Sequence, residues 1–323
     1  MMIDLPSLNL DDLDRLADWV ELSTLAESTG ALSQDNVARV LRASGLVGYA
    51  RTEVFVDDEA FADDDLFSDD ETANRLAEQI WEQFRYRVHS LSPAYPFDPR
   101  GATLMLKADT WRDVPAYSML LVLDVGRSYK DQHIGIVPDT TTGRLFEKVV
   151  EASVRGLLRG PSSRFGWPIE PSWPTGIDDR VERLAEELEL QVENLQGKTD
   201  PQDKDRGLDV VGRMAIADGS MGTVAVLVQC AAGEKWTEKK GEPSLANWRD
   251  ILRWDAELVR GVAVPWRLQG RWDIRRAYRH FDALILDRPR LLAGNPDAFL
   301  DEHTKTELVS WCVPLFQAFR RID

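Results

Sequence analysis

The chain has 323 residues, enough for two domains of ordinary size, and its 43% hydrophobic and 29% charged residues indicate a folded protein rather than a disordered one. A formal net charge of −16 disfavours non-specific wrapping of nucleic acid, although a local basic patch could still bind phosphates. Two cysteines are too few for a disulfide framework, and no signal-like or membrane-spanning stretch occurs, so we expect a cytoplasmic protein.

Helical patterns dominate the N-terminal part of the chain. Apolar residues recur at helical spacing from about Leu10 to Ser28, and Ser33 is a good N-cap for a second helix that stops near Gly45. Residues 57–71 contain nine acidic side chains in fifteen positions. We interpret this stretch as a solvated acidic loop leading into a helix over 71–91. The alternative is a mimic of nucleic-acid phosphate or a docking strip for a basic partner.

A domain boundary is expected near residue 140. Strands are predicted at Ala102 to Ala108 and at Tyr117 to Val125, the second of which is apolar enough to be buried on both faces. The turn-rich stretch Pro138 to Gly143 follows. The sequence therefore predicts an acidic, mostly helical N-terminal module over 1–140 and a second domain over 141–323.

The second domain mixes strands with helices. Helices are predicted at Arg144 to Leu158, Asp178 to Gln196, Trp272 to Phe281 and Thr304 to Arg320. Strands are predicted at Gly207 to Ala217, Thr223 to Ala231, Val259 to Pro265 and Ala283 to Leu286. The turn residues 218–222 make the first two of these strands a hairpin. This order predicts an α/β domain with a central mixed sheet flanked by helices.

Three polar residues of this domain interrupt apolar elements. Glu147 lies near the start of the first helix, Asp209 begins a strand, and Gln229 ends the apolar run of the next strand. Antiparallel pairing places the start of one strand beside the end of the next, so Asp209 and Gln229 should lie close together and could hold a cation. The alternative is that the Asp is a turn or capping residue and that the Glu faces solvent.

This series of a helix Glu, a strand Asp and a Gln on the following strand resembles the PD-(D/E)xK phosphodiesterase superfamily, over about Gly143 to Trp236. The resemblance implies a restriction-endonuclease-like fold for the C-terminal domain. It also implies Mg²⁺ held by Glu147, Asp209 and Gln229, cleavage of DNA or RNA, and a role in bacterial phage defence.

The chain departs from that family at its lysine. Ala231 stands where the motif has Lys, and the displaced cation would come from Lys239 or from its neighbours Lys235 and Lys240. Two hypotheses remain open. The first is a variant metal-dependent nuclease with Glu147, Asp209, Gln229 and Lys239 as its catalytic residues. The second is a catalytically inactive nuclease fold that binds a protein partner through the acidic N-terminal module.

A row of arginines is predicted on the helix around Trp272. Arg271, Arg275 and Arg279 recur every four positions and so share one helix face. Such a row suits the phosphates of nucleic acid, and the alternative is a solvated face paired with carboxylates.

Overall fold

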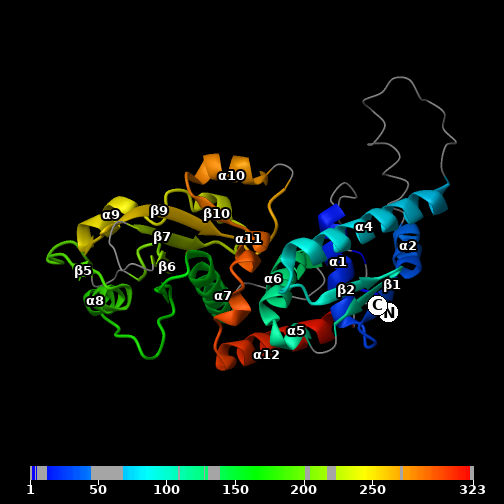
Figure 1. The fold of residues 1–323 in the computed structure, drawn as a ribbon, viewed down its shortest axis with the longest axis horizontal. Coiled ribbons are helices and arrows are strands. Elements are labelled where there is room, and N and C mark those ends of the chain that lie inside the picture. Colours follow the sequence, from blue (N-terminus) through cyan, green and yellow to red (C-terminus); the bar gives the residue numbers. More distant parts are fainter. Residues whose placement is uncertain are drawn as a thin grey trace, which may run out of the picture. The chain divides into compact units, whose positions relative to one another are not determined.

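The structure is a computed structural model that describes residues 2–3, 5, 13–44, 68–107, 110–126, 128–129, 139–200, 204–216, 223–269 and 272–320. The chain divides into two compact units, which we call the first unit, Met1–Ile136 together with Val309–Asp323, and the second unit, Val137–Leu308 (Figure 1). The first unit therefore differs from the predicted module over 1–140 by including the C-terminal segment of the chain.

The first unit combines helices with a small antiparallel sheet. The sheet has the strand order β1-β3-β2. The elements are α1 (Leu13–Ala26), β1 (Ala31–Ser33), α2 (Gln34–Ala43), α4 (Asp69–Leu91), β2 (Phe97–Arg100), β3 (Thr103–Leu106), α5 (Thr110–Asp113) and α6 (Pro115–Val125), with the last part of α12 (Glu302–Phe319). The helices predicted over 10–28 and from Ser33, and the strand predicted over 102–108, are confirmed.

Side-chain caps fix where the helices of this unit begin. The Ser33 hydroxyl accepts a hydrogen bond from the backbone N–H of Asn36, as expected for the N-cap of α2. Ser68 and Glu71 form a capping box at the start of α4, so the helix begins at Asp69 with three acidic residues in its first turn. Residues 57–67 of the acidic stretch lie outside the described residues.

The strand predicted over Tyr117 to Val125 is wrong, because these residues form the helix α6. Every residue of α6 is buried and most are apolar, so the segment carries no periodicity that separates a buried helix from a buried strand. Pro115 at its first position favours the helix start. At 11 residues α6 is too short to cross a bilayer, and none of the helices in the described ranges has the length and apolar character to do so.

A five-stranded mixed sheet organises the second unit. Its strand order is β10-β9-β7-β6-β4, in which the β4–β6 and β6–β7 pairs are antiparallel and the β7–β9 and β9–β10 pairs are parallel. The strands of the unit are β4 (Ser162–Arg164), β5 (Gln191–Val192), β6 (Val210–Arg213), β7 (Thr223–Cys230), β8 (Leu252–Arg253), β9 (Ala256–Ala263) and β10 (Leu284–Leu286). The predicted hairpin of β6 and β7 is confirmed, and its turn, 217–222, lies outside the described residues.

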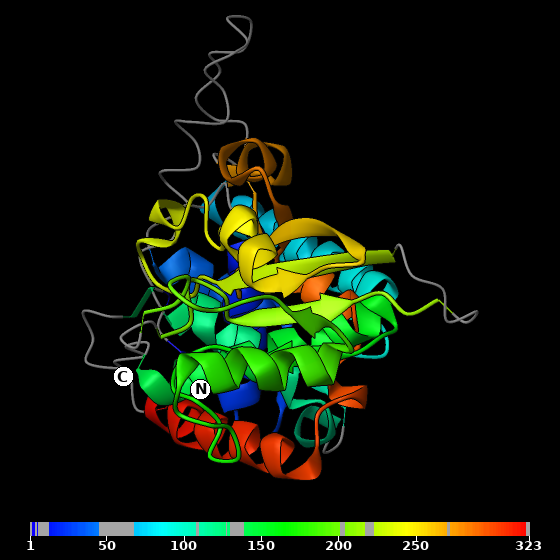
Figure 2. The ribbon, with the colours of Figure 1, turned by 90° about the vertical axis from the view of Figure 1, so that its left-hand side faces the viewer.

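Helices cover both faces of this sheet. They are α7 (Thr140–Leu158), α8 (Ile177–Leu188), η2 (Trp236–Glu238), α9 (Leu245–Ile251), α10 (Ile274–Phe281), α11 (Arg288–Ala293), η4 (Pro296–Ala298) and the first part of α12. On one face α7 packs tightly on Gly212 of β6 through Val154. On the other face, α8 and α9 pack in an apolar cluster with Val211 of β6 and Leu227 of β7. Val211 precedes Gly212, and successive residues of a strand point to opposite faces of the sheet. Figure 1 shows α7 on one side of the sheet and α9 and α10 on the other, and Figure 2 again shows α10 to one side of it. The predicted mixed sheet flanked by helices is therefore confirmed.

Two predicted elements end earlier than expected. The helix predicted to reach Gln196 stops at Leu188, because Glu189 adopts a left-handed conformation with φ of 55° and closes the helix. The strand predicted over 207–217 is limited to β6, which pairs with β7 along its length and with β4 through Val210, Val211 and Gly212.

Candidate active site

Asp209 and Gln229 lie against each other across the β6–β7 hairpin. Gln229 Nε2 donates a hydrogen bond of 2.5 Å to Asp209 Oδ2, and the backbone N–H of Cys230 donates one of 2.6 Å to the same oxygen. The backbone N–H of Asp209 in turn donates to the Val228 carbonyl at 3.0 Å. These hydrogen bonds fix Asp209 beside the end of strand β7. The prediction that the Asp209 and Gln229 side chains lie close together is confirmed.

Glu147 reaches the same place from α7. A side-chain carbon built on Gly166 would lie 2.4 Å from Glu147 Oε2 and 3.1 Å from Asp209 Oδ1, so both carboxylates face the space beside this glycine. Both are largely buried. The structure therefore brings together Glu147, Asp209 and Gln229, three residues that the sequence spreads over more than eighty positions.

A buried guanidinium accompanies the carboxylates. Arg164, at the end of β4, is 3% exposed and places its Nε 2.7 Å from Glu147 Oε2. Its two terminal nitrogens donate to Glu170 Oε1 at 3.3 Å and to the Pro168 carbonyl at 2.7 Å. Arg164 could not be singled out from the sequence, because an arginine in a Pro- and Trp-rich segment carries no mark of burial. Only the pairing of β4 with β6 places it beside Asp209.

Burial raises the pKa values of both carboxyls. Desolvation raises the pKa of Glu147, and the neighbouring Asp209 charge raises it further, while the Arg164 guanidinium opposes the shift. Desolvation also raises the pKa of Asp209, against the hydrogen bond from the Cys230 N–H. Burial and the same carboxylates hold the pKa of the Cys230 thiol well above its usual range, so Cys230 is not an activated nucleophile. A cation bound here would favour the ionised carboxylates and so lower both pKa values.

The oxygens of this cluster suit a hard divalent cation. Gln229 Oε1 is buried and accepts no hydrogen bond from the described residues, Glu147 Oε2 pairs with Arg164 Nε at 2.7 Å, and both carboxylates approach the backbone at Gly166. Carboxylate and amide oxygens are the donors that Mg²⁺ prefers. The described residues contain no cluster of three or more His, Cys, Asp or Glu side chains arranged for a metal, so Gln229 would complete the ligand set beside two carboxylates.

Lys239 lies at the rim of this site. Its positive charge lowers the pKa of Asp209, and its Nζ lies 3.2 Å from Glu242 Oε2. The Glu242 stem and Gln229 Oε1 both flank Gly207, which places the Lys239–Glu242 pair next to Gln229. Lys235, by contrast, is 82% exposed and paired with Glu238.

Two of the three arginines of the predicted row, Arg275 and Arg279, belong to the described residues. Arg275 and Arg279 are exposed on α10, and Arg276 stacks over the Trp272 ring at 5.4 Å, whereas Arg271 lies outside the described residues. Among described side chains, neither Arg275 nor Arg279 forms an ion pair with a carboxylate. His280 of the same helix contacts the Thr237 carbonyl at 2.9 Å, which ties α10 to the segment that carries Lys239.

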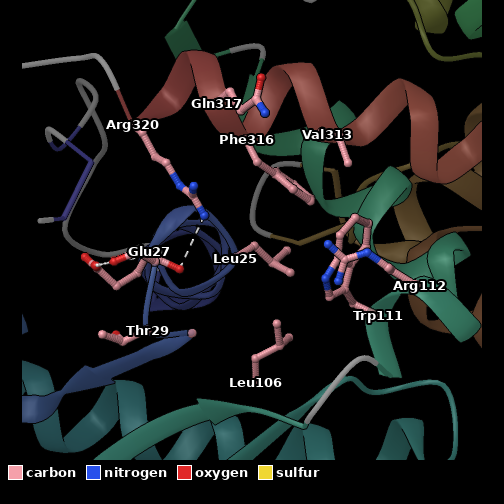
Figure 3. A pocket seen from close by; sticks show the side chains of 12 residues that line it. Leu25, Glu27, Thr29, Leu106, Trp111, Arg112, Val313, Phe316, Gln317 and Arg320 are labelled. Atoms are coloured by element: carbon pink, nitrogen blue, oxygen red, sulfur yellow. Dashed lines mark hydrogen bonds between the residues drawn. The ribbon is translucent and has the colours of Figure 1, made fainter.

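A separate cavity of about 430 Å³ opens in the first unit between α1, α5 and the end of α12 (Figure 3). Trp111 and Phe316 meet edge to face in its wall, with ring centroids 5.2 Å apart. The Arg320 guanidinium in this wall donates to the Ala26 carbonyl at the end of α1, so it serves as a helix C-cap. None of the predicted site residues lines this cavity.

Gly166→Ala is expected to disrupt the packing of the Glu147 and Asp209 carboxylates against the backbone. The new methyl group would overlap the Glu147 carboxylate, which cannot move without leaving Arg164, so we expect a loss of about 1–3 kcal/mol in the free energy of unfolding. Gly143→Ala, at a position of α7 with nothing within 4 Å, should instead raise it by roughly 0.5–1 kcal/mol. Urea denaturation of the two variants measures the difference, and equal stabilities would contradict the tight approach at Gly166.

Comparison of the chain with protein-family models, with curated proteins and with solved structures finds no match.

Proposed function

We propose that the second unit is a metal-dependent phosphodiesterase that cleaves DNA or RNA, with a restriction-endonuclease-like fold. The observation that carries the proposal is the meeting of Glu147, Asp209 and Gln229 at one edge of a mixed sheet. The order of helix, strand, turn and strand on which the resemblance rests is supported by α7, β6 and β7. By analogy with that superfamily, the biological role would be phage defence.

In this proposal the two carboxylates and the Gln229 amide oxygen hold Mg²⁺. When bound, the ion would polarise a phosphate and lower the pKa of an attacking water. Asp209 is positioned for this task by the Gln229 amide and by the Cys230 N–H, and Glu147 is positioned by Arg164. Arg164 and Lys239 supply the positive charge that Ala231 does not, and either could stabilise charge on a phosphate in the site.

The exposed arginines of α10 would bind the substrate backbone. Arg275 and Arg279 are exposed on a helix that His280 connects to the segment bearing Lys239. Guanidinium groups without a carboxylate partner are available for phosphate oxygens.

Metal binding gives the first test. Mg²⁺ or Mn²⁺ at about 100 times its Kd should raise the melting temperature by roughly 5–10 °C, because a ligand that binds only the folded state stabilises it by mass action. Asp209→Ala should abolish both this gain and the cleavage of a nucleic-acid substrate. The exposed Asp250→Ala serves as the matched control and should leave both unchanged. A metal response that survives Asp209→Ala would remove Asp209 from the site.

A second candidate function has its own support. Ala231 lacks the motif ammonium, and Arg164 already neutralises Glu147. These two features favour a nuclease fold without catalysis, which binds a protein partner through the acidic N-terminal module. Under this hypothesis neither metal ion shifts the melting temperature and wild-type protein cleaves no nucleic acid, whereas the proposed nuclease loses cleavage when Lys239 is changed to Met.

A further inference from the structure

Trp167 is the one tryptophan of the described residues with a largely exposed side chain. It is 47% exposed, whereas the other tryptophans are buried or half-buried. Burying an aromatic ring is strongly favourable, so a ring left in water beside a polar site is a natural binding surface for a flat partner.

The backbone around Trp167 is attached directly to the candidate active site. The backbone N–H groups of Phe165 and Gly166 donate to the Asp209 carbonyl at 2.8 and 3.0 Å. On the other side of Trp167, the Pro168 carbonyl accepts a hydrogen bond of 2.7 Å from Arg164, the residue that pairs with Glu147. The segment that carries the exposed ring is therefore held by Asp209 and by Arg164, which fixes its position relative to the candidate active site.

The surroundings of the ring fit an anionic chain with aromatic groups. Gly166, the residue before Trp167, faces Glu147 and Asp209, where the proposed function places a phosphate and its metal. The Lys204 ammonium lies 5.9 Å from the centre of the Trp167 ring. Nucleic acid combines these features, because each phosphate is joined through its sugar to a base with a flat face.

We propose that Trp167 stacks on an unpaired base next to the phosphate in the site, so that the substrate is a single strand or a duplex with an unpaired end. A base inside an intact duplex already stacks on its neighbours and cannot offer its face to the ring. This inference rests on the proposed nuclease function, and it narrows the substrate class of the same site.

The test compares a short single-stranded oligonucleotide, made as DNA and as RNA, with a blunt duplex of the same sequence. The strand carries 2-aminopurine, whose fluorescence falls when it stacks, and Ca²⁺ replaces Mg²⁺ to limit cleavage. Wild-type protein should bind the single strand more tightly than the duplex and quench the probe. Trp167→Ala should weaken single-strand binding roughly 5- to 150-fold and remove the quenching, because stacking contributes about 1–3 kcal/mol per base.

Trp167→Phe keeps an aromatic face and should retain most of the binding and quenching. Tyr86→Ala removes a side chain of the first unit that is 56% exposed and should change neither. Unchanged single-strand binding in Trp167→Ala, or an equal loss for strand and duplex, would overturn the stacking role while leaving the nuclease proposal in place. Wild-type protein that binds no nucleic acid in either form would overturn both.

Discussion

Arg87→Met should destabilise the first unit by about 3–5 kcal/mol, because removal of one partner from a buried ion pair leaves uncompensated charge in the interior. Arg87 is 3% exposed and its guanidinium lies 2.7 Å from Asp18 Oδ1 and 2.8 Å from Glu21 Oε1, both of them buried carboxylates. The Tyr95 and Tyr117 hydroxyls donate to the two Glu21 oxygens at 2.6 Å each. Burial and the Glu21 charge hold the pKa of Tyr95 well above its usual range, so this hydroxyl remains a donor.

Arg85→Met on the same helix provides the control for this prediction. Arg85 is exposed on α4, so its replacement should change the free energy of unfolding by less than about 0.5 kcal/mol. Urea denaturation followed by circular dichroism measures both variants. A loss below about 1 kcal/mol for Arg87→Met would mean that the carboxylates of α1 do not depend on this guanidinium.

Arg164→Met is expected to lower stability by about 3 kcal/mol and to make stability more dependent on metal. Without the guanidinium, the buried Glu147 carboxylate loses the cation beside it, and the partly buried Glu170 keeps only Lys148 at 3.8 Å. If Mg²⁺ binds beside Glu147 and Asp209, it supplies the missing positive charge, so the variant should bind Mg²⁺ more tightly than the wild-type protein and gain more stability at one fixed Mg²⁺ concentration. We therefore expect a larger metal-induced rise in melting temperature in this variant than in the wild-type protein.

Arg183→Met is the matched control for Arg164. Arg183 also contacts two carboxylates, Glu186 and Glu187, but its side chain is 49% exposed, and exposed pairs contribute about 1 kcal/mol or less. Its loss should leave the metal response unchanged. Thermal denaturation with and without Mg²⁺ distinguishes the outcomes, and an Arg164→Met variant that Mg²⁺ does not stabilise would argue for the inactive nuclease fold.

Local chemistry in the sequence was sufficient for several parts of this protein. Ser33 predicted the start of α2, because a hydroxyl at that position satisfies a free N–H of the first turn. The hairpin of β6 and β7 followed from two apolar runs around a turn, and antiparallel pairing then placed Asp209 beside Gln229. These features depend on residues that are close together in the sequence, within one turn or one hairpin. Sequence patterns over a short range are therefore enough to predict them.

Other features were decided only by tertiary structure. The segment of α6 is mostly apolar, and its helical form depends on the fully buried surroundings that it occupies. Arg164 lies beside Glu147 because β4 pairs with β6 while α7 packs on the same sheet, and the exposed Trp167 follows Gly166, whose backbone N–H is bound to the Asp209 carbonyl. These contacts join residues from separate elements, and desolvation by those elements raises the pKa of the carboxyls. Residue types in the chain determined which groups were available for chemistry, and packing determined which of them were buried together.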